Sequence, residues 1–124
     1  MTREIKIWDG EVADEINRLS GLLDRALTAM RDRKRAEAVA ERDYRRARAE
    51  AWLRHTDGSA MERKDAVEAA TADARYERDL LRGDHQAAWE AVRNYRAQIS
   101  AIQSLLRAQT AEAEFSRTGP QVQP

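Results

Sequence analysis

Helix-breaking residues are almost absent from this chain of 124 residues, and their scarcity limits the folds that it can adopt. Both prolines, Pro120 and Pro124, stand at the C-terminal end. Before them, only the segment 55–59 combines a glycine with Thr, Asp and Ser, which are residues that favour turns. Because Pro and Gly are the residues that most oppose helix formation, a chain with a single such break predicts two long helices joined by a tight turn.

The segment 55–59 also carries the signals for ending one helix and starting the next. Gly58 can adopt the left-handed conformation that commonly follows a helix C-terminus. Ser59 is followed three residues later by Glu62, which is the spacing of a capping box. We therefore predict a helix over residues 10–54, a turn at 55–59, a second helix over 60–115 and a flexible tail at 116–124. Residues 1–9 are compatible with a short strand or an anchoring arm.

Each predicted helix carries an apolar stripe whose members are alternately three and four residues apart. Such stripes are typical of helices that pack against partner helices. A hairpin of two helices covers only one side of each stripe. We therefore predict an all-α fold in which residues 1–115 form one long antiparallel hairpin domain that assembles into a coiled-coil-like homo-oligomer, such as a ring. The residues expected in the core or the oligomer interface are Ile16, Leu19, Leu23, Val92, Tyr95, Ile99, Ile102 and Leu106.

Positive charge is concentrated in one part of the chain, although the formal net charge is zero. Residues 31–54 contain nine Lys and Arg against five Asp and Glu. On a helix, six of these cations share an arc of about 120° that contains none of the five acids. This basic arc consists of Arg31, Lys34, Arg35, Arg42, Arg45 and Arg46. The opposite face holds Ala36, Ala40, Tyr44, Ala47 and Ala51, which suit close helix packing.

Two interpretations of the basic arc stay open. A row of cations with an aromatic residue at its end, here Trp52, is how proteins hold single-stranded nucleic acid without sequence preference. The arc is equally compatible with a solvated helix face, balanced in part by the i,i+4 pairs Glu41/Arg45 and Glu50/Arg54. Trp52 can likewise be a structural plug between the two helices.

The sequence lacks the combinations of residues that carry enzymatic chemistry. There is no cysteine, and His55 and His85 are not at the spacing of metal ligands. No glycine-rich phosphate loop occurs, and no nucleophile stands beside an orienting base. We expect no enzymatic activity, no cofactor and no metal. Neither a signal peptide nor a membrane-spanning apolar run is present, so we expect a soluble cytoplasmic protein without membrane partners.

The segment 46–52, Arg-Ala-Arg-Ala-Glu-Ala-Trp, stands just before the turn at Gly58. It resembles the basic-x-basic-x-acid-x-aromatic segment that precedes a Gly-containing loop in the UvsY-type recombination mediators of double-stranded DNA phages. Arg63 and Lys64 after the loop, Trp89 and the segment 99–105 extend the resemblance over roughly residues 30–110. The Arg-rich run is longer here, and the loop is shorter.

The resemblance implies a small helical protein that forms a homo-oligomeric ring or barrel. Such mediators bind single-stranded DNA, help to displace single-strand-binding protein and load a RecA-like recombinase, in the host cytoplasm if the chain is phage-encoded. Arg46 and Arg48 match the DNA-contacting basic pair of the family. Since Arg48 lies off the basic arc, either the DNA path is broader than one face or only part of the arc contacts DNA. The DNA-binding candidates are thus the basic arc, Arg48 and Trp52.

Two other function classes remain. The first is a non-enzymatic coiled-coil structural, assembly or adaptor protein, in which the arginines pair with acids of a partner or keep the helix in solution. The second is a small inhibitor that uses one face of the second helix as a ligand for a groove. A mediator requires DNA affinity that falls steeply with salt, whereas a structural protein requires only self-association.

Overall fold

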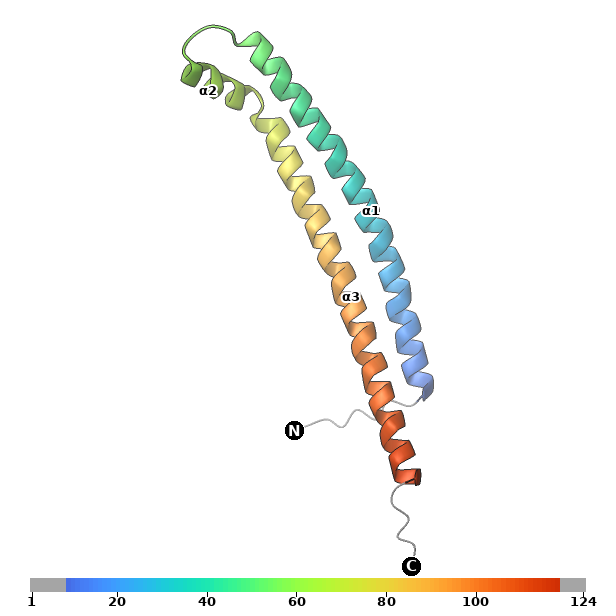
Figure 1. Cartoon of the computed structure of the whole chain (residues 1–124). Helices are drawn as coiled ribbons and strands as arrows, with labels where there is room; N and C mark the ends of the chain where they lie inside the picture. Colours follow the sequence, from blue (N-terminus) through green and yellow to red (C-terminus); the bar gives the residue numbers. More distant parts are fainter. Residues whose placement is uncertain (1–8, 119–124) are drawn as a thin grey trace, which may run out of the picture. The chain divides into compact units, whose positions relative to one another are not determined.

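The computed structural model of the chain describes residues 9–118, and these are almost entirely helical, with no strand among them. Helix α1 spans Asp9–Arg54, α2 spans Ala60–Ala70 and α3 spans Ala72–Thr118 (Figure 1). The prediction of an all-α chain with two long helices is therefore confirmed. None of the three described helices is long and apolar enough to cross a lipid bilayer.

The break between the first two helices lies where the sequence predicts it. Helix α1 ends at Arg54, and Gly58 has a positive φ of 94°. The Ser59 hydroxyl accepts a hydrogen bond from the Glu62 N–H at 3.1 Å, which caps the start of α2. The positive φ favours glycine here, and a Cβ on Gly58 would in addition make a tight contact of 3.3 Å with the Cβ of Glu62.

The single second helix predicted for residues 60–115 is wrong, because the helix changes direction at Thr71. Thr71 has φ −110° and ψ 6°, outside the helical range, and it separates α2 from α3. Its backbone N–H and its hydroxyl both donate to the Val67 carbonyl, at 3.0 and 2.8 Å. A threonine hydroxyl that shares a carbonyl acceptor with the backbone N–H in this way is a known cause of helix bending. Figure 1 shows α2 turned away from the direction of α3.

The predicted tail at 116–124 is also partly wrong, since α3 continues to Thr118. The rest of that tail lies outside the described residues. So do residues 1–8, for which a strand or an arm was expected, and Asp9 already belongs to α1.

The chain divides into two compact units. Unit 1 contains the start of α1, up to Arg25, together with α3 from Val92 onward. Unit 2 contains the rest of α1, all of α2 and α3 up to Ala91. The single hairpin domain therefore stays a prediction, as does its assembly into an oligomer.

Unit 1 is a pair of antiparallel helix segments with a thin apolar core. Val12, Leu19 and Val92 are buried, Leu19 with 1% and Val92 with 0% of their surface exposed. The other expected core residues are half-buried: Ile16, Leu23, Tyr95, Ile99, Ile102 and Leu106. Residues 110–118 of α3 are exposed throughout.

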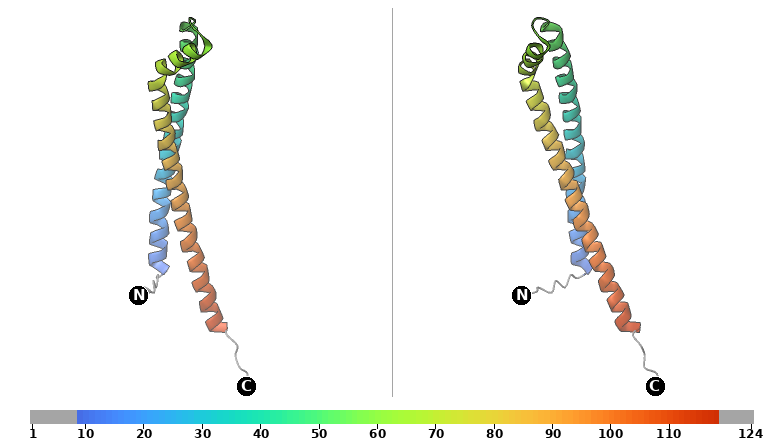
Figure 2. Two further views of the ribbon diagram at one scale, coloured as in Figure 1. Left: turned by 90° about the vertical axis from the view of Figure 1, so that its left-hand side faces the viewer. Right: turned by 60° about the vertical axis from the view of Figure 1, so that its left-hand side comes forward.

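Unit 2 packs through alanines of α1 and through Val67 of α2, which is 1% exposed. Ala40 and Ala51 of α1 are buried, and Ala36, Tyr44 and Ala47 on the same face are half-buried. The packing face expected from the helical wheel is thus turned away from solvent. The views in Figure 2 agree that α1 and α3 run side by side in this unit.

Candidate nucleic-acid interface

The α1 segment of unit 2 carries the candidate cations, and all of them are exposed. This holds for each member of the basic arc and for Arg48. The helix orients them, because Ala40, Tyr44 and Ala51 occupy its packing face and leave the arc on the opposite side.

Most of these cations have no acidic partner. Arg42 lies 3.4 Å from a carboxylate oxygen of Asp43, and Arg45 lies 2.9 Å from one of Glu41. The second of these is one of the two i,i+4 pairs expected from the sequence, and the other, Glu50 with Arg54, is also present at 3.4 Å. Five candidates make no ion pair with any residue that the structure describes: Arg31, Lys34, Arg35, Arg46 and Arg48.

Two acids of the same segment also contact α3. Glu37 and Glu41 point toward α3, where they form a polar seam with Arg78, Arg82 and His85. Glu37 lies 3.4 Å from Arg82 and 2.8 Å from Nδ1 of His85. Glu41 lies 3.5 Å from both Arg78 and Arg82. The seam therefore holds Glu37 against α3, whereas Glu41 is shared between the seam and Arg45 of the basic arc.

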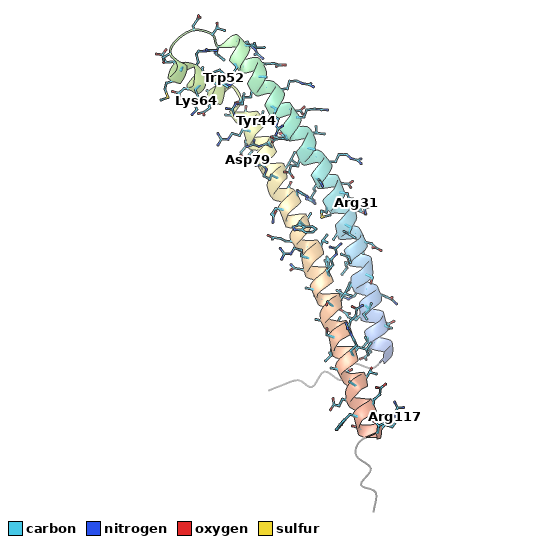
Figure 3. All side chains as sticks on the ribbon, in the orientation of Figure 1. Arg31, Tyr44, Trp52, Lys64, Asp79 and Arg117 are labelled. Carbon is cyan, nitrogen blue, oxygen red and sulfur yellow. The ribbon has the colours of Figure 1, made fainter. Side chains whose placement is uncertain are left out.

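Tyr44 continues this seam by one helical turn. The Arg78 guanidinium lies over its ring, 4.4 Å from the centroid, and the Arg78 side chain is only 16% exposed. Figure 3 shows Tyr44 between α1 and α3. Arg78 also donates to Oδ1 of Asp79 at 2.8 and 3.0 Å, and this bond lowers the pKa of the Asp79 carboxyl.

The ring of Trp52 is in contact with an arginine of α2. The Arg63 guanidinium of α2 lies 5.4 Å from the centroid of its ring, and Trp52 is half-buried. Nε of Arg63 also donates to the His55 carbonyl at 2.8 Å, which satisfies a backbone acceptor just after the end of α1. Figure 3 places Trp52 at the end of α1 beside α2. These contacts favour the structural interpretation of Trp52 over base stacking.

Two open hollows flank the seam of unit 2, on opposite sides of the packing face of α1. One, of about 730 Å³, is lined by apolar residues that include Val39 and Leu81, by the acids Asp32, Asp43, Asp73 and Glu77, and by Arg35 of the basic arc, so that acids predominate. The other, of about 410 Å³, is lined by four arginines, Arg45, Arg48, Arg75 and Arg78. An anion is therefore attracted to one flank of the unit and repelled from the other.

Arg75 is the residue that the sequence analysis missed. It belongs to a segment, 55–84, in which acids outnumber bases by eight to five, so local charge does not single it out. Only the pairing of α1 with α3 places it in the same hollow as Arg48. Within the described residues, no group of three or more His, Cys, Asp or Glu side chains could hold a metal ion.

Comparisons with known proteins add no family to this description. No protein-family model matches the chain, and neither a curated protein nor a solved structure matches it.

Proposed function

We propose that the chain is a phage-type recombination mediator that binds single-stranded DNA through the basic arc of α1 and helps to load a RecA-like recombinase. One observation supports the DNA-binding step above all others. The arc is exposed and four of its six cations make no ion pair with any described residue, while Glu37 is held in the seam with α3 and Glu41 is shared between the seam and Arg45. A face of uncompensated cations on a rigid helix gains affinity by releasing the counterions of a phosphate backbone.

Recombinase loading and displacement of single-strand-binding protein rest on the resemblance of the segment 46–52 to UvsY-type mediators. Homo-oligomerisation is part of the same proposal. It is supported by the thin core of unit 1 and by exposed apolar side chains there, such as Leu105 and Phe115. Several copies of the arc would raise the affinity for one strand through multivalency.

A second candidate is a coiled-coil structural or assembly protein without DNA affinity. The exposed apolar residues of α3 favour it, since Tyr76 and Leu80 of unit 2 join those of unit 1. Sedimentation equilibrium without DNA would show an oligomer under either proposal, so DNA binding is the measurement that separates them.

The test is fluorescence anisotropy with a labelled oligo-dT strand over a series of salt concentrations. We expect Arg42→Ala combined with Arg46→Ala to weaken binding at least about tenfold at low salt. Each lost phosphate contact should reduce the slope of log K against log salt by about 0.7, as is typical of single strands. Because both side chains are exposed, the oligomer should remain intact.

The matched control is Arg93→Ala combined with Arg96→Ala. These two arginines are exposed on α3 of unit 1, and the double variant loses the same net charge. Equal losses of affinity in the two double variants would reject the arc as the interface. Absence of binding at low salt by the folded wild-type protein would reject DNA binding and favour the structural protein.

A further inference from the structure

The arginine-lined hollow of unit 2 brings together residues from two helices that are far apart in the sequence. Arg45 and Arg48 come from α1, and Arg75 and Arg78 come from α3. The hollow also includes Thr71, where α2 turns away from α3. The bend at Thr71 thus borders a concave surface whose lining includes four arginines.

Two of these four arginines already make ion pairs. Glu41 lies 2.9 Å from Arg45 and 3.5 Å from Arg78, and Arg78 is held further by Asp79 and by the ring of Tyr44. Arg48 and Arg75, by contrast, make no ion pair with any described residue. They carry the positive excess of the hollow.

Glu68 of α2 is the other acid that lines the hollow, and no described residue pairs with it either. Its carboxylate is exposed and partly offsets the two free arginines. With Glu41 balanced by its own partners, the hollow keeps a net positive charge. Arginine suits such a site, because its planar fork of N–H donors matches the oxygens of a phosphate group.

Arg45 links the hollow to the basic arc, since it belongs to both. Arg48 follows it by three residues and lies beyond the edge of the arc. The exposed cations therefore do not stop at the edge of α1. They continue across the flank of the unit to Arg75 on α3. Arg48, which lies outside the arc, therefore stands between the arc and Arg75.

We propose that the hollow is a second phosphate subsite, in which a phosphodiester group of the bound single strand lies between Arg48 and Arg75. The strand then leaves the face of α1 and crosses to α3 at the bend. This inference rests on the proposed DNA-binding function and adds Arg75 to its contacts. A free pyrophosphate shares the same chemistry, so the experiment includes both ligands.

The first arm compares Arg75→Gln with Lys64→Gln in the oligo-dT titration. Lys64 is exposed on α2 and does not line the hollow, so its loss changes the net charge equally. We expect Arg75→Gln to weaken binding about fivefold and to reduce the salt slope by about 0.7. Lys64→Gln should stay within about twofold of the wild type. Both side chains are exposed, and far-UV circular dichroism should show unchanged helix content.

A second pair of variants tests the subsite by a gain of affinity. Glu68→Gln removes the unpaired carboxylate from the hollow, whereas Asp65→Asn removes an exposed carboxylate of the same helix that does not line it. We expect Glu68→Gln to bind oligo-dT about threefold more tightly, and Asp65→Asn to bind less than about twofold more tightly. Equal effects of these two variants would count against the subsite.

The outcomes separate this inference from the function on which it rests. If the Arg42/Arg46 double variant weakens binding but Arg75→Gln and Lys64→Gln behave alike, the subsite is wrong and the DNA-binding function stands. If the Arg42/Arg46 double variant and its Arg93/Arg96 control behave alike, the arc is not the interface, and if the folded wild-type protein does not bind oligo-dT at low salt, the function itself fails. Pyrophosphate binding that Arg75→Gln abolishes in calorimetry, with oligo-dT affinity unchanged, would assign the hollow to a free phosphate and overturn the strand path.

Discussion

The two units of this chain join their helices by different means. In unit 1, buried Val12, Leu19 and Val92 form an apolar core. In unit 2, the contact between α1 and α3 combines alanines with the polar seam from Glu37 and Glu41 to the α3 side chains. Apolar burial contributes most of the stability of a helix pair, whereas partly exposed ion pairs contribute little.

The polar seam is suited to fixing the register of α1 against α3. Its charged groups stand at defined positions on both helices, so that a shift of one helix by a turn would separate them. It also holds Glu37 of α1 against α3. We infer that in unit 2 the seam fixes the register of α1 against α3 and that the same unit presents the cations.

The largest expected effect is on the core of unit 1. Leu19→Ala should lower the free energy of unfolding by about 3 kcal/mol, since it removes a fully buried side chain and leaves a cavity. Urea denaturation followed by far-UV circular dichroism measures this change. The control is Leu53→Ala, a leucine that is 80% exposed and whose loss should cost less than about 1 kcal/mol. Similar losses in both variants would mean that Leu19 is no core residue in solution.

A smaller effect is expected at the seam of unit 2. In a double-mutant cycle of Glu37→Gln and Arg82→Gln, we expect a coupling energy of about 0.5–1 kcal/mol at low salt that decreases at high salt. The pair is 3.4 Å apart and joins two helices. The exposed pair Glu50 with Arg54, also 3.4 Å apart but within α1, is the control and should couple more weakly. If the coupling energy between Glu37 and Arg82 is no larger than that between Glu50 and Arg54, the seam does not set the register of α1 against α3.

The smallest effect concerns two exposed carboxyls, one in each unit. The hydrogen bond from Arg18 lowers the pKa of Glu15, and the one from Arg78 lowers the pKa of Asp79. Arg75 and Arg82 lower the Asp79 pKa further. Each interaction therefore stabilises the fold fully above the ordinary carboxyl pKa of about 4, and its contribution is lost as the pH falls through the lower folded value.

Titration of both carboxyl groups by NMR tests this difference between the units. Added salt should raise the Asp79 pKa more than the Glu15 pKa, because the additional arginines act on Asp79 through space and are screened. The urea-unfolded chain should show ordinary values for both groups. If salt raised the Glu15 pKa as much as the Asp79 pKa, Arg75 and Arg82 would not contribute to the lowered pKa of Asp79.

Local interactions explain the features that could be predicted from the sequence. The helix over 10–54, the turn at Gly58 and the cap from Ser59 to Glu62 depend on residues within a few positions of one another, and all are present. The packing face of α1 follows from helical periodicity alone, and so does the exposure of the basic arc. The pairs Glu41/Arg45 and Glu50/Arg54 are also local, at one turn of helix.

Only the tertiary structure decided which residues meet across the two long helices. The bend at Thr71 falls between alanines that favour helix, at a threonine that is 4% exposed and hydrogen-bonded to Val67. Partners such as Glu37 and Arg82, or Arg48 and Arg75, are brought together by the register of α1 against α3. Periodicity determines the face on which a side chain lies, but it does not determine the residue on another helix that will lie opposite, because that depends on how the whole pair of helices packs.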